Sequence, residues 1–143
     1  RDPEMSRGLG DVYKRQDLCV KVEKVHYQEL EQTTQEESSE SIRERVVMAH
    51  KRQRERYEKE GFFYNSQIPA KKIATFCALK KDEKRHMQQI YETLNLSVRS
   101  YHKILKTART IADIEGSEEI RMEHLHEAIC YRSIDSNFWE RRR

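Results

Sequence analysis

The residues best placed to do chemistry lie at the start of a predicted helix, around Ser97 and Arg99. Ser97 is a favourable N-cap residue, so Arg99 falls at the second helical position, beside backbone N–H groups that have no partner within a helix. Because the helix dipole is positive at this end, a cation is unfavourable there and a bound anion would relieve the conflict. Lys103 and Lys106 follow on the same stripe and extend the positive charge. A solvated amphipathic helix explains such spacing more often than a phosphate site does, so both interpretations stay open.

The sequence contains no complete motif for catalysis or metal binding. It has 4 glycines and no G-x-x-x-x-G-K-[ST] phosphate loop, so this chain alone is not expected to hydrolyse a nucleotide. No G-x-S-x-G turn is present to hold a nucleophilic serine. His124 and His126 are two residues apart, which directs them to different sides of a helix and argues against a shared metal ion. We therefore predict no catalytic residue and no metal ligand.

The composition favours a single small helical domain. The chain has 143 residues, of which 37% are charged and 36% hydrophobic, with 4 Gly, 2 Pro and a formal net charge of +3. No stretch approaches the roughly 18 consecutive apolar residues of a membrane span, and no signal peptide is recognisable. Cys19, Cys77 and Cys130 form no C-x-x-C pair, so we expect reduced thiols. These features predict a cytoplasmic protein with no membrane partner.

The sequence before residue 39 shows no helical pattern. Residues 1–16 lack apolar periodicity and are predicted to be a disordered or non-native segment. Residues 17–25 read DLCVKVEKV and alternate apolar with polar side chains, as a half-buried β-strand does, yet the chain offers no partner strand. We interpret this orphan strand as the last strand of a sheet that is otherwise missing. Residues 26–38 are polar and acidic and are predicted to be a linker.

Residues 39–135 are predicted to form an all-α bundle of about five helices, with a charged tail at 136–143. The first helix, at about 40–60, has one apolar stripe that we expect to be buried. That stripe consists of Ile42, Val46, Ala49 and Tyr57. Ser41 begins a capping-box pattern, Ser38 and Ser39 are alternative caps, and Gly61 is the predicted end.

Four further helices are predicted after this one. A short helix begins near Pro69, and a third helix is capped by Asp82. The fourth helix follows Ser97 and ends before Gly116, with apolar residues at the spacing of one helical face. The last helix is predicted at about 122–132. Its inward-facing residues are expected to be Leu125, Ala128 and Ile129.

Several blocks of this sequence resemble, in the same order, the C-terminal region of the magnesium-chelatase-like AAA+ ATPases of the YifB/ComM group. The blocks are SESIRERVVMAHKRQRERY, FFYNSQIP and LSVRSYHKILKTARTIADIEGSEEIRMEHLHEAICYRSID. The similarity runs from about Asp17 to Asp135. The resemblance implies that residues 17–25 are the final strand of a truncated AAA+ core, and that the helices form the lid of that core.

The resemblance also assigns roles to particular residues and names partners. Arg99 matches the sensor-two arginine, which reaches from the lid to the γ-phosphate of ATP, with Ser97 and Lys103 as supporting residues on the phosphate side. ATP and Mg²⁺ would then be bound by the full-length protein and not by this chain alone. Arg109 and Arg132 match family positions too, and we expect salt bridges from both in place of catalysis. The implied partners are the protein's own AAA+ core and neighbouring subunits of a ring homo-oligomer, with DNA as a further candidate.

Two alternatives without a nucleotide role stay open. A helical nucleic-acid-binding module is suggested by the basic residues of the chain, although acidic residues interleave with them and favour solvated faces. The basic residues in question are those of 43–56, Lys71, Lys72, Lys80, Lys81, Lys84, Arg85 and Arg141–Arg143. A protein-interaction bundle is suggested by aromatic residues that could dock a partner or close the bundle. These aromatic residues are Phe62, Phe63, Tyr64, Phe138 and Trp139.

Overall fold

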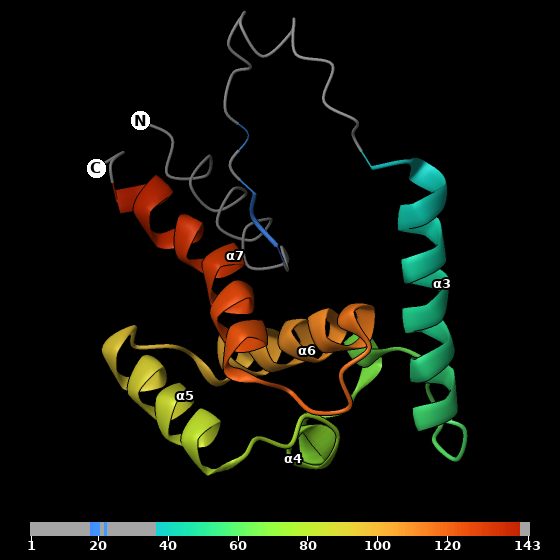
Figure 1. The fold of residues 1–143 in the computed structure, drawn as a ribbon. Helices are drawn as coiled ribbons and strands as arrows, with labels where there is room; N and C mark the ends of the chain where they lie inside the picture. The colour runs from blue at the N-terminus through green and yellow to red at the C-terminus, as the bar shows by residue number, and fades with distance from the viewer. Residues whose placement is uncertain (1–17, 21, 23–36, 141–143) are drawn as a thin grey trace, which may run out of the picture.

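The computed structural model describes residues 18–20, 22 and 37–140, and the side chains among them up to Arg132. Within these ranges the chain forms five α-helices and two short 3₁₀ turns (Figure 1). The elements are α3 (Ser39–Arg56), η1 (Asn65–Gln67), η2 (Ala70–Lys72), α4 (Ile73–Phe76), α5 (Lys81–Thr93), α6 (Val98–Glu115) and α7 (Met122–Glu140). The prediction of an all-α, five-helix domain is therefore confirmed for the described part of the chain. The segment at 1–16, most of the strand predicted at 17–25 and most of the linker predicted at 26–38 lie outside the described residues.

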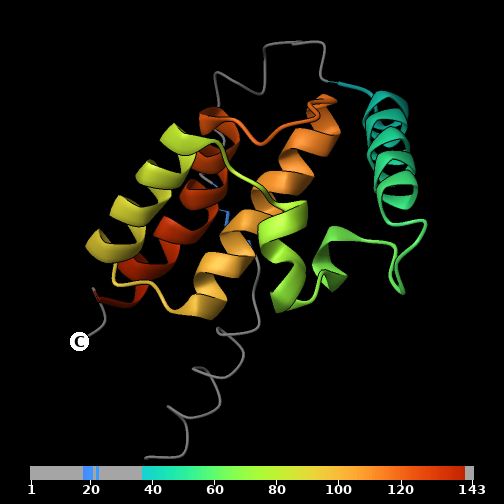
Figure 2. The ribbon, with the colours of Figure 1, turned by 90° about the horizontal axis from the view of Figure 1, so that it is seen from below.

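Helix α6 is the central element of the domain. It crosses the middle of the molecule and packs against α7, α3, α4 and η1 (Figure 1). Seen from below, α5 lies beside α7 on one side of α6, and α3 lies on the other side (Figure 2). Gly116 ends α6 with a positive φ of 87° and donates its N–H to the carbonyl of Ala112. The bounds and the apolar face predicted for this helix are therefore confirmed.

The hydrophobic core gathers around α6. Burying one such aliphatic or aromatic side chain typically stabilises a fold by about 1.5–3 kcal/mol relative to leaving it exposed. The buried core residues are Tyr57, Phe62, Ile68, Ile73, Cys77, Met87, Ile104, Leu105, Ala108, Ile120, Leu125 and Ala128. These residues come from α4, α5, α6 and α7 and from the segments that join the helices, including Tyr57 directly after α3, so the bundle has one shared core.

Helix α3 differs from its prediction at both ends and on its buried face. Ser38 caps it, accepting a hydrogen bond from the Ser41 N–H at 3.2 Å, so the alternative cap is the correct one. The helix ends at Arg56 and not near Gly61, because Tyr57 leaves helical geometry. Of the predicted apolar stripe, only the half that reaches α6 is buried, while the first two turns of α3 project past α6 and leave their apolar side chains exposed (Figure 1).

Three smaller predictions are also corrected. Lys80, not Asp82, occupies the N-cap position of α5, and Asp82 lies in the first turn, where its charge favours the helix dipole. Pro69 precedes the 3₁₀ turn η2 and not a regular helix. Helix α7 continues to Glu140, eight residues beyond its predicted end at 132.

None of the helices in the described ranges is long and apolar enough to cross a membrane.

Candidate functional site

The turn between α5 and α6 sets the position of the candidate site at the start of α6. Asn95 adopts a left-handed conformation with φ of 46°, which asparagine tolerates better than most residues. The Leu96 N–H then donates to the carbonyl of Tyr91 at 3.0 Å, and the Leu96 side chain packs against the core. This closure fixes the direction in which α6 begins.

The first turn of α6 leaves positive charge uncompensated. The Ser97 side-chain oxygen accepts the Ser100 N–H at 3.1 Å, which satisfies the third N–H of the helix. The N–H groups of Val98 and Arg99 precede the first intrahelical hydrogen bond and have no helical partner. No acidic residue lies in this first turn. The helix start is therefore suited to an anion supplied from outside the described residues.

Arg99 is exposed at this helix start, and within the described part of the chain its guanidinium makes no hydrogen bond or ion pair. Lys106 differs, because its ammonium donates to the carbonyl of Ser66 at 2.9 Å and ties α6 to η1. Lys103 is half-buried and, with Lys106, borders a surface hollow of about 270 Å³ that also includes Leu18. The basic stripe predicted from spacing is thus divided: Arg99 faces solvent, whereas Lys106 has a structural role.

A buried polar network occupies the opposite end of α6. Asp113 is fully buried and accepts two hydrogen bonds from the Arg56 guanidinium, at 2.5 and 2.9 Å, and one from the Asn65 amide at 2.8 Å. Arg109 forms an ion pair with Asp113 at 3.2 Å, so the salt bridge predicted for Arg109 is present. The network joins α3, η1 and α6 around one carboxylate. The salt bridge predicted for Arg132 stays a prediction.

The net change in pKa is opposite for the two arginines that pair with Asp113, of which Arg109 is buried and Arg56 is half-buried. Burial lowers the pKa of Arg109 below its ordinary value, although the charge of Asp113 acts against that change. For Arg56 burial acts in the same direction, but the hydrogen bond and charge of Asp113 outweigh it and raise the pKa. Arg109 also donates to the carbonyls of Ser117 and Glu118, which closes the loop after α6. We therefore assign this network to stability and not to catalysis.

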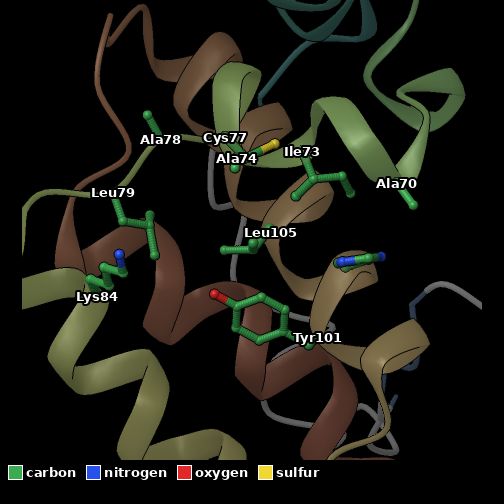
Figure 3. Close-up of a pocket in the computed structure, with 10 residues that line it drawn as sticks. Ala70, Ile73, Ala74, Cys77, Ala78, Leu79, Lys84, Tyr101 and Leu105 are labelled. Carbon is green, nitrogen blue, oxygen red and sulfur yellow. The ribbon is translucent and has the colours of Figure 1, made fainter.

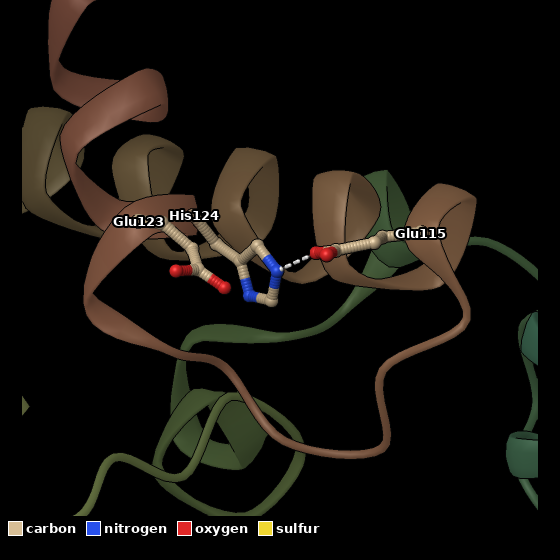
Figure 4. Close-up of side chains that lie close together, drawn as sticks. All are labelled: Glu115, Glu123 and His124. Carbon is tan, nitrogen blue, oxygen red and sulfur yellow. Dashed lines mark hydrogen bonds and ion pairs between the residues drawn. The ribbon is translucent and has the colours of Figure 1, made fainter.

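Three potential metal ligands lie close together at the end of α6 and at the start of α7. They are Glu115, Glu123 and His124, whose ligand atoms lie within 4.8 Å of one another (Figure 4). However, the His124 Nδ1 atom accepts the Arg121 N–H at 3.0 Å, which caps the start of α7, and Nε2 bonds to Glu115. Arg121 also pairs with Glu115 at 2.6 Å and with Glu123 at 2.9 Å. Hydrogen bonds from His124 and then Arg121 hold the pKa of Glu115 below its usual range. Both ring nitrogens are thus used, and the cluster acts as a helix cap.

An apolar cavity of about 260 Å³ lies between α4, α5 and α6 (Figure 3). Cys77 is buried at its wall, and burial raises the pKa of that thiol to about 11, so it is not an activated nucleophile. Leu105 and Leu79 contribute apolar surface, while the side chains of Tyr101 and Lys84 also line it. The cavity contains no paired acid and base, which leaves the start of α6 as the candidate site.

The basic residues considered for nucleic-acid binding are partly paired within the domain. Arg52 donates to the carbonyl of Asp113 at 2.8 Å, and Arg56 to its carboxylate. Further ion pairs are Arg45–Glu37, Lys72–Glu60 and Lys80–Glu119. Direct DNA contact by this region stays a prediction. Among the aromatic residues considered for docking a partner, Phe62 is buried in the core, while Phe63 is exposed.

Replacing Ser97 by alanine should lower the free energy of unfolding by about 1 kcal/mol, because the Ser100 N–H loses its cap. Urea denaturation of the wild-type chain and the variant measures the difference. Ser97→Asp is the matched control, since a carboxylate also caps the helix and favours its dipole, and should retain the wild-type stability. Equal stability of Ser97→Ala and wild type would contradict the capping role.

The sequence is similar to those of several known proteins. Residues 36–132 match the family model described as magnesium chelatase, subunit ChlI C-terminal. The chain is 40% identical over 99 residues to the uncharacterized protein YifB of Salmonella typhimurium, an alignment that covers 69% of this chain and 19% of the relative. It is 35% identical over 131 residues to the competence protein ComM of Haemophilus influenzae, with 91% of this chain and 25% of the relative covered. The chain thus spans about a fifth to a quarter of the length of these relatives.

Proposed function

The chain belongs to the family of the C-terminal domain of magnesium chelatase subunit ChlI, and from that premise we propose that it is the helical lid of a larger AAA+ ATPase, in which Arg99 senses the γ-phosphate of ATP. One observation carries the proposal. Arg99 is exposed at the first turn of α6, where backbone N–H groups have no helical partner and no acidic residue lies nearby in the turn. In this proposal, the phosphate of a bound nucleotide interacts with Arg99 and with these N–H groups.

The chemistry of this helix start fits a phosphate group. A guanidinium is permanently charged and donates in a fixed fork that matches phosphate oxygens, while the helix dipole adds favourable charge. In the proposed ATPase the missing phosphate loop and Mg²⁺ site belong to the core, and Ser97 keeps the helix start in shape for Arg99. Loss of the γ-phosphate removes the contact and changes the preferred orientation of the lid. The lid then acts as a two-state element biased by nucleotide.

The exposed half of α3 supports a second contact of the lid. Four apolar side chains there are between 40% and 57% exposed, namely Ile42, Val46, Val47 and Met48. Arg99 and Asp113, which anchors α3, are 14 residues apart on α6, a rise of about 21 Å along the helix axis. The phosphate site and the apolar face therefore lie at opposite ends of the domain. This separation lets the lid touch its own core at one end and a neighbouring subunit of a ring at the other.

The proposal predicts a large loss of ATP turnover when Arg99 is replaced by alanine in the full-length ATPase. We expect kcat to fall by about 10²- to 10³-fold, the effect of removing one well-placed donor from a developing negative charge. Arg99→Lys keeps the charge but loses the fork, and should fall between wild type and Arg99→Ala. Steady-state ATP hydrolysis and nucleotide-dependent assembly measure the effect.

Lys51→Ala is the matched control for this experiment. Lys51 is an exposed cation on α3, remote from the start of α6, so its loss should leave turnover unchanged. Because Arg99 is exposed and makes no hydrogen bond or ion pair within the described part of the chain, Arg99→Ala should also unfold at the same urea concentration as wild type. If Arg99→Ala hydrolysed ATP and assembled as wild type does, the sensor role would be wrong.

A further inference from the structure

Two histidines from different helices meet on a surface that the proposed function does not use. His86 of α5 and His126 of α7 place their Nε2 atoms 3.0 Å apart, with ring centroids 4.8 Å apart and the rings nearly perpendicular at 74°. His86 is half-buried and His126 is exposed. The contact joins two helices that lie side by side (Figure 2). It is separate from the Glu115–His124 cap, because His124 and His126 point to different sides of α7.

The short distance between the two Nε2 atoms restricts the protonation of the two rings. At 3.0 Å one ring must donate an N–H and the other must accept it, since two lone pairs or two N–H groups would repel each other. A metal ion can take the place of this shared proton. In a tetrahedral site with metal–nitrogen bonds of about 2.0–2.1 Å, two ligand nitrogens lie about 3.3 Å apart. The observed separation therefore needs only a few tenths of an ångström of opening to admit such an ion.

We propose that His86 and His126 form a binding site for a divalent transition-metal ion of the Zn²⁺ class, and that the ion clamps α5 to α7. Imidazole is a common ligand for such ions, and each helix fixes one of the two ligands. Water completes the coordination at this exposed position. Cys130 follows His126 by one helical turn and carries an exposed thiol, so its contribution must be separated experimentally.

The experiment uses the whole 143-residue chain and zinc chloride as the probe. Isothermal titration should show one Zn²⁺ ion per chain, and the melting temperature should rise by about 10 °C at a zinc concentration one hundred times the dissociation constant. His86→Ala and His126→Ala should each lose this rise, because a single imidazole cannot bridge the helices. The melting temperature of each variant without zinc shows whether the variant folds.

Two variants distinguish the pair from other ligands. His50→Ala removes an exposed histidine on α3, and Cys130→Ser removes the nearby thiol. Both should keep the one-to-one binding and the zinc-dependent rise. The proposal is overturned if zinc leaves the wild-type melting temperature unchanged, if His86→Ala and His126→Ala bind zinc as tightly as wild type does, or if Cys130→Ser abolishes binding.

Discussion

Replacing Asp113 by alanine should lower the free energy of unfolding by about 3–5 kcal/mol, a large fraction of the roughly 5–15 kcal/mol that typically stabilises a folded domain. Asp113 is 0% exposed and is the carboxylate shared by Arg56, Arg109 and the amide of Asn65. Its removal leaves two guanidinium groups in a partly buried site with no opposite charge. The cost therefore comes mainly from stranded cations and not from the lost volume of one small side chain.

Urea denaturation followed by circular dichroism measures this change. Asp113→Asn keeps the shape and part of the hydrogen bonding but not the charge, so it should also be strongly destabilised. The double variant Asp113→Ala/Arg56→Met removes one stranded cation and should be more stable than Asp113→Ala alone. If the unfolding free energy of Asp113→Ala lay within about 1 kcal/mol of the wild-type value, the network would contribute no more than an exposed ion pair does. The stabilising role inferred from the burial of Asp113 would then be wrong.

The buried network also explains which part of α3 is fixed. Every contact of α3 with Asp113 comes from its last two turns, through Arg52 and Arg56. The Asn65 N–H donates to Gln53 at 2.9 Å and holds the same turns to η1. The first turns of α3 have no corresponding attachment to α6, which agrees with their exposed apolar side chains. The lid proposal uses this arrangement, because the attached last turns of α3 hold its exposed apolar face in one orientation.

Local sequence rules predicted α6 well because every signal there agrees. Ser97 caps the helix, Gly116 ends it, and one apolar face lies between them, so no tertiary contact had to override the local preference. The same rules placed Arg99 at the second helical position, and the structure places it there. The start of the candidate site was therefore predictable from spacing and capping alone.

Predictions failed where tertiary contacts decide the outcome. Ile42 and Val46 have the right spacing for burial, but burial depends on whether another element lies opposite them. Asp113 lies four residues after Arg109 on α6, a spacing that suggests an ion pair, yet its bonds to Arg56 and Asn65 span about fifty residues of chain. His86 and His126 are 40 residues apart in the sequence, so no helical-spacing argument could have predicted that they meet.

Tyr57→Ala should be as damaging as the loss of Asp113, but through packing. The Tyr57 ring is fully buried and lies 4.8 Å from the Phe62 ring and 5.0 Å from the Phe76 ring, centroid to centroid. Removing a buried aromatic side chain typically costs about 3–5 kcal/mol, because the neighbours cannot close the cavity. Its hydroxyl donates to the side-chain oxygen of Asn65 at 2.5 Å, so the aromatic cluster and the polar network meet at this residue.

Tyr57→Phe separates the two contributions, since it keeps the ring and deletes only the hydroxyl. Its cost should be about 0.5–1.5 kcal/mol, because the Asn65 side-chain oxygen keeps a longer contact with Arg56. Urea denaturation gives both free energies, and hydrogen exchange should show that Tyr57→Ala loses protection in α3 before α6. If Tyr57→Phe were as unstable as Tyr57→Ala, the hydrogen bond and not the aromatic packing would hold α3 to the bundle. If α6 lost protection first, α3 would not be the element that Tyr57 secures.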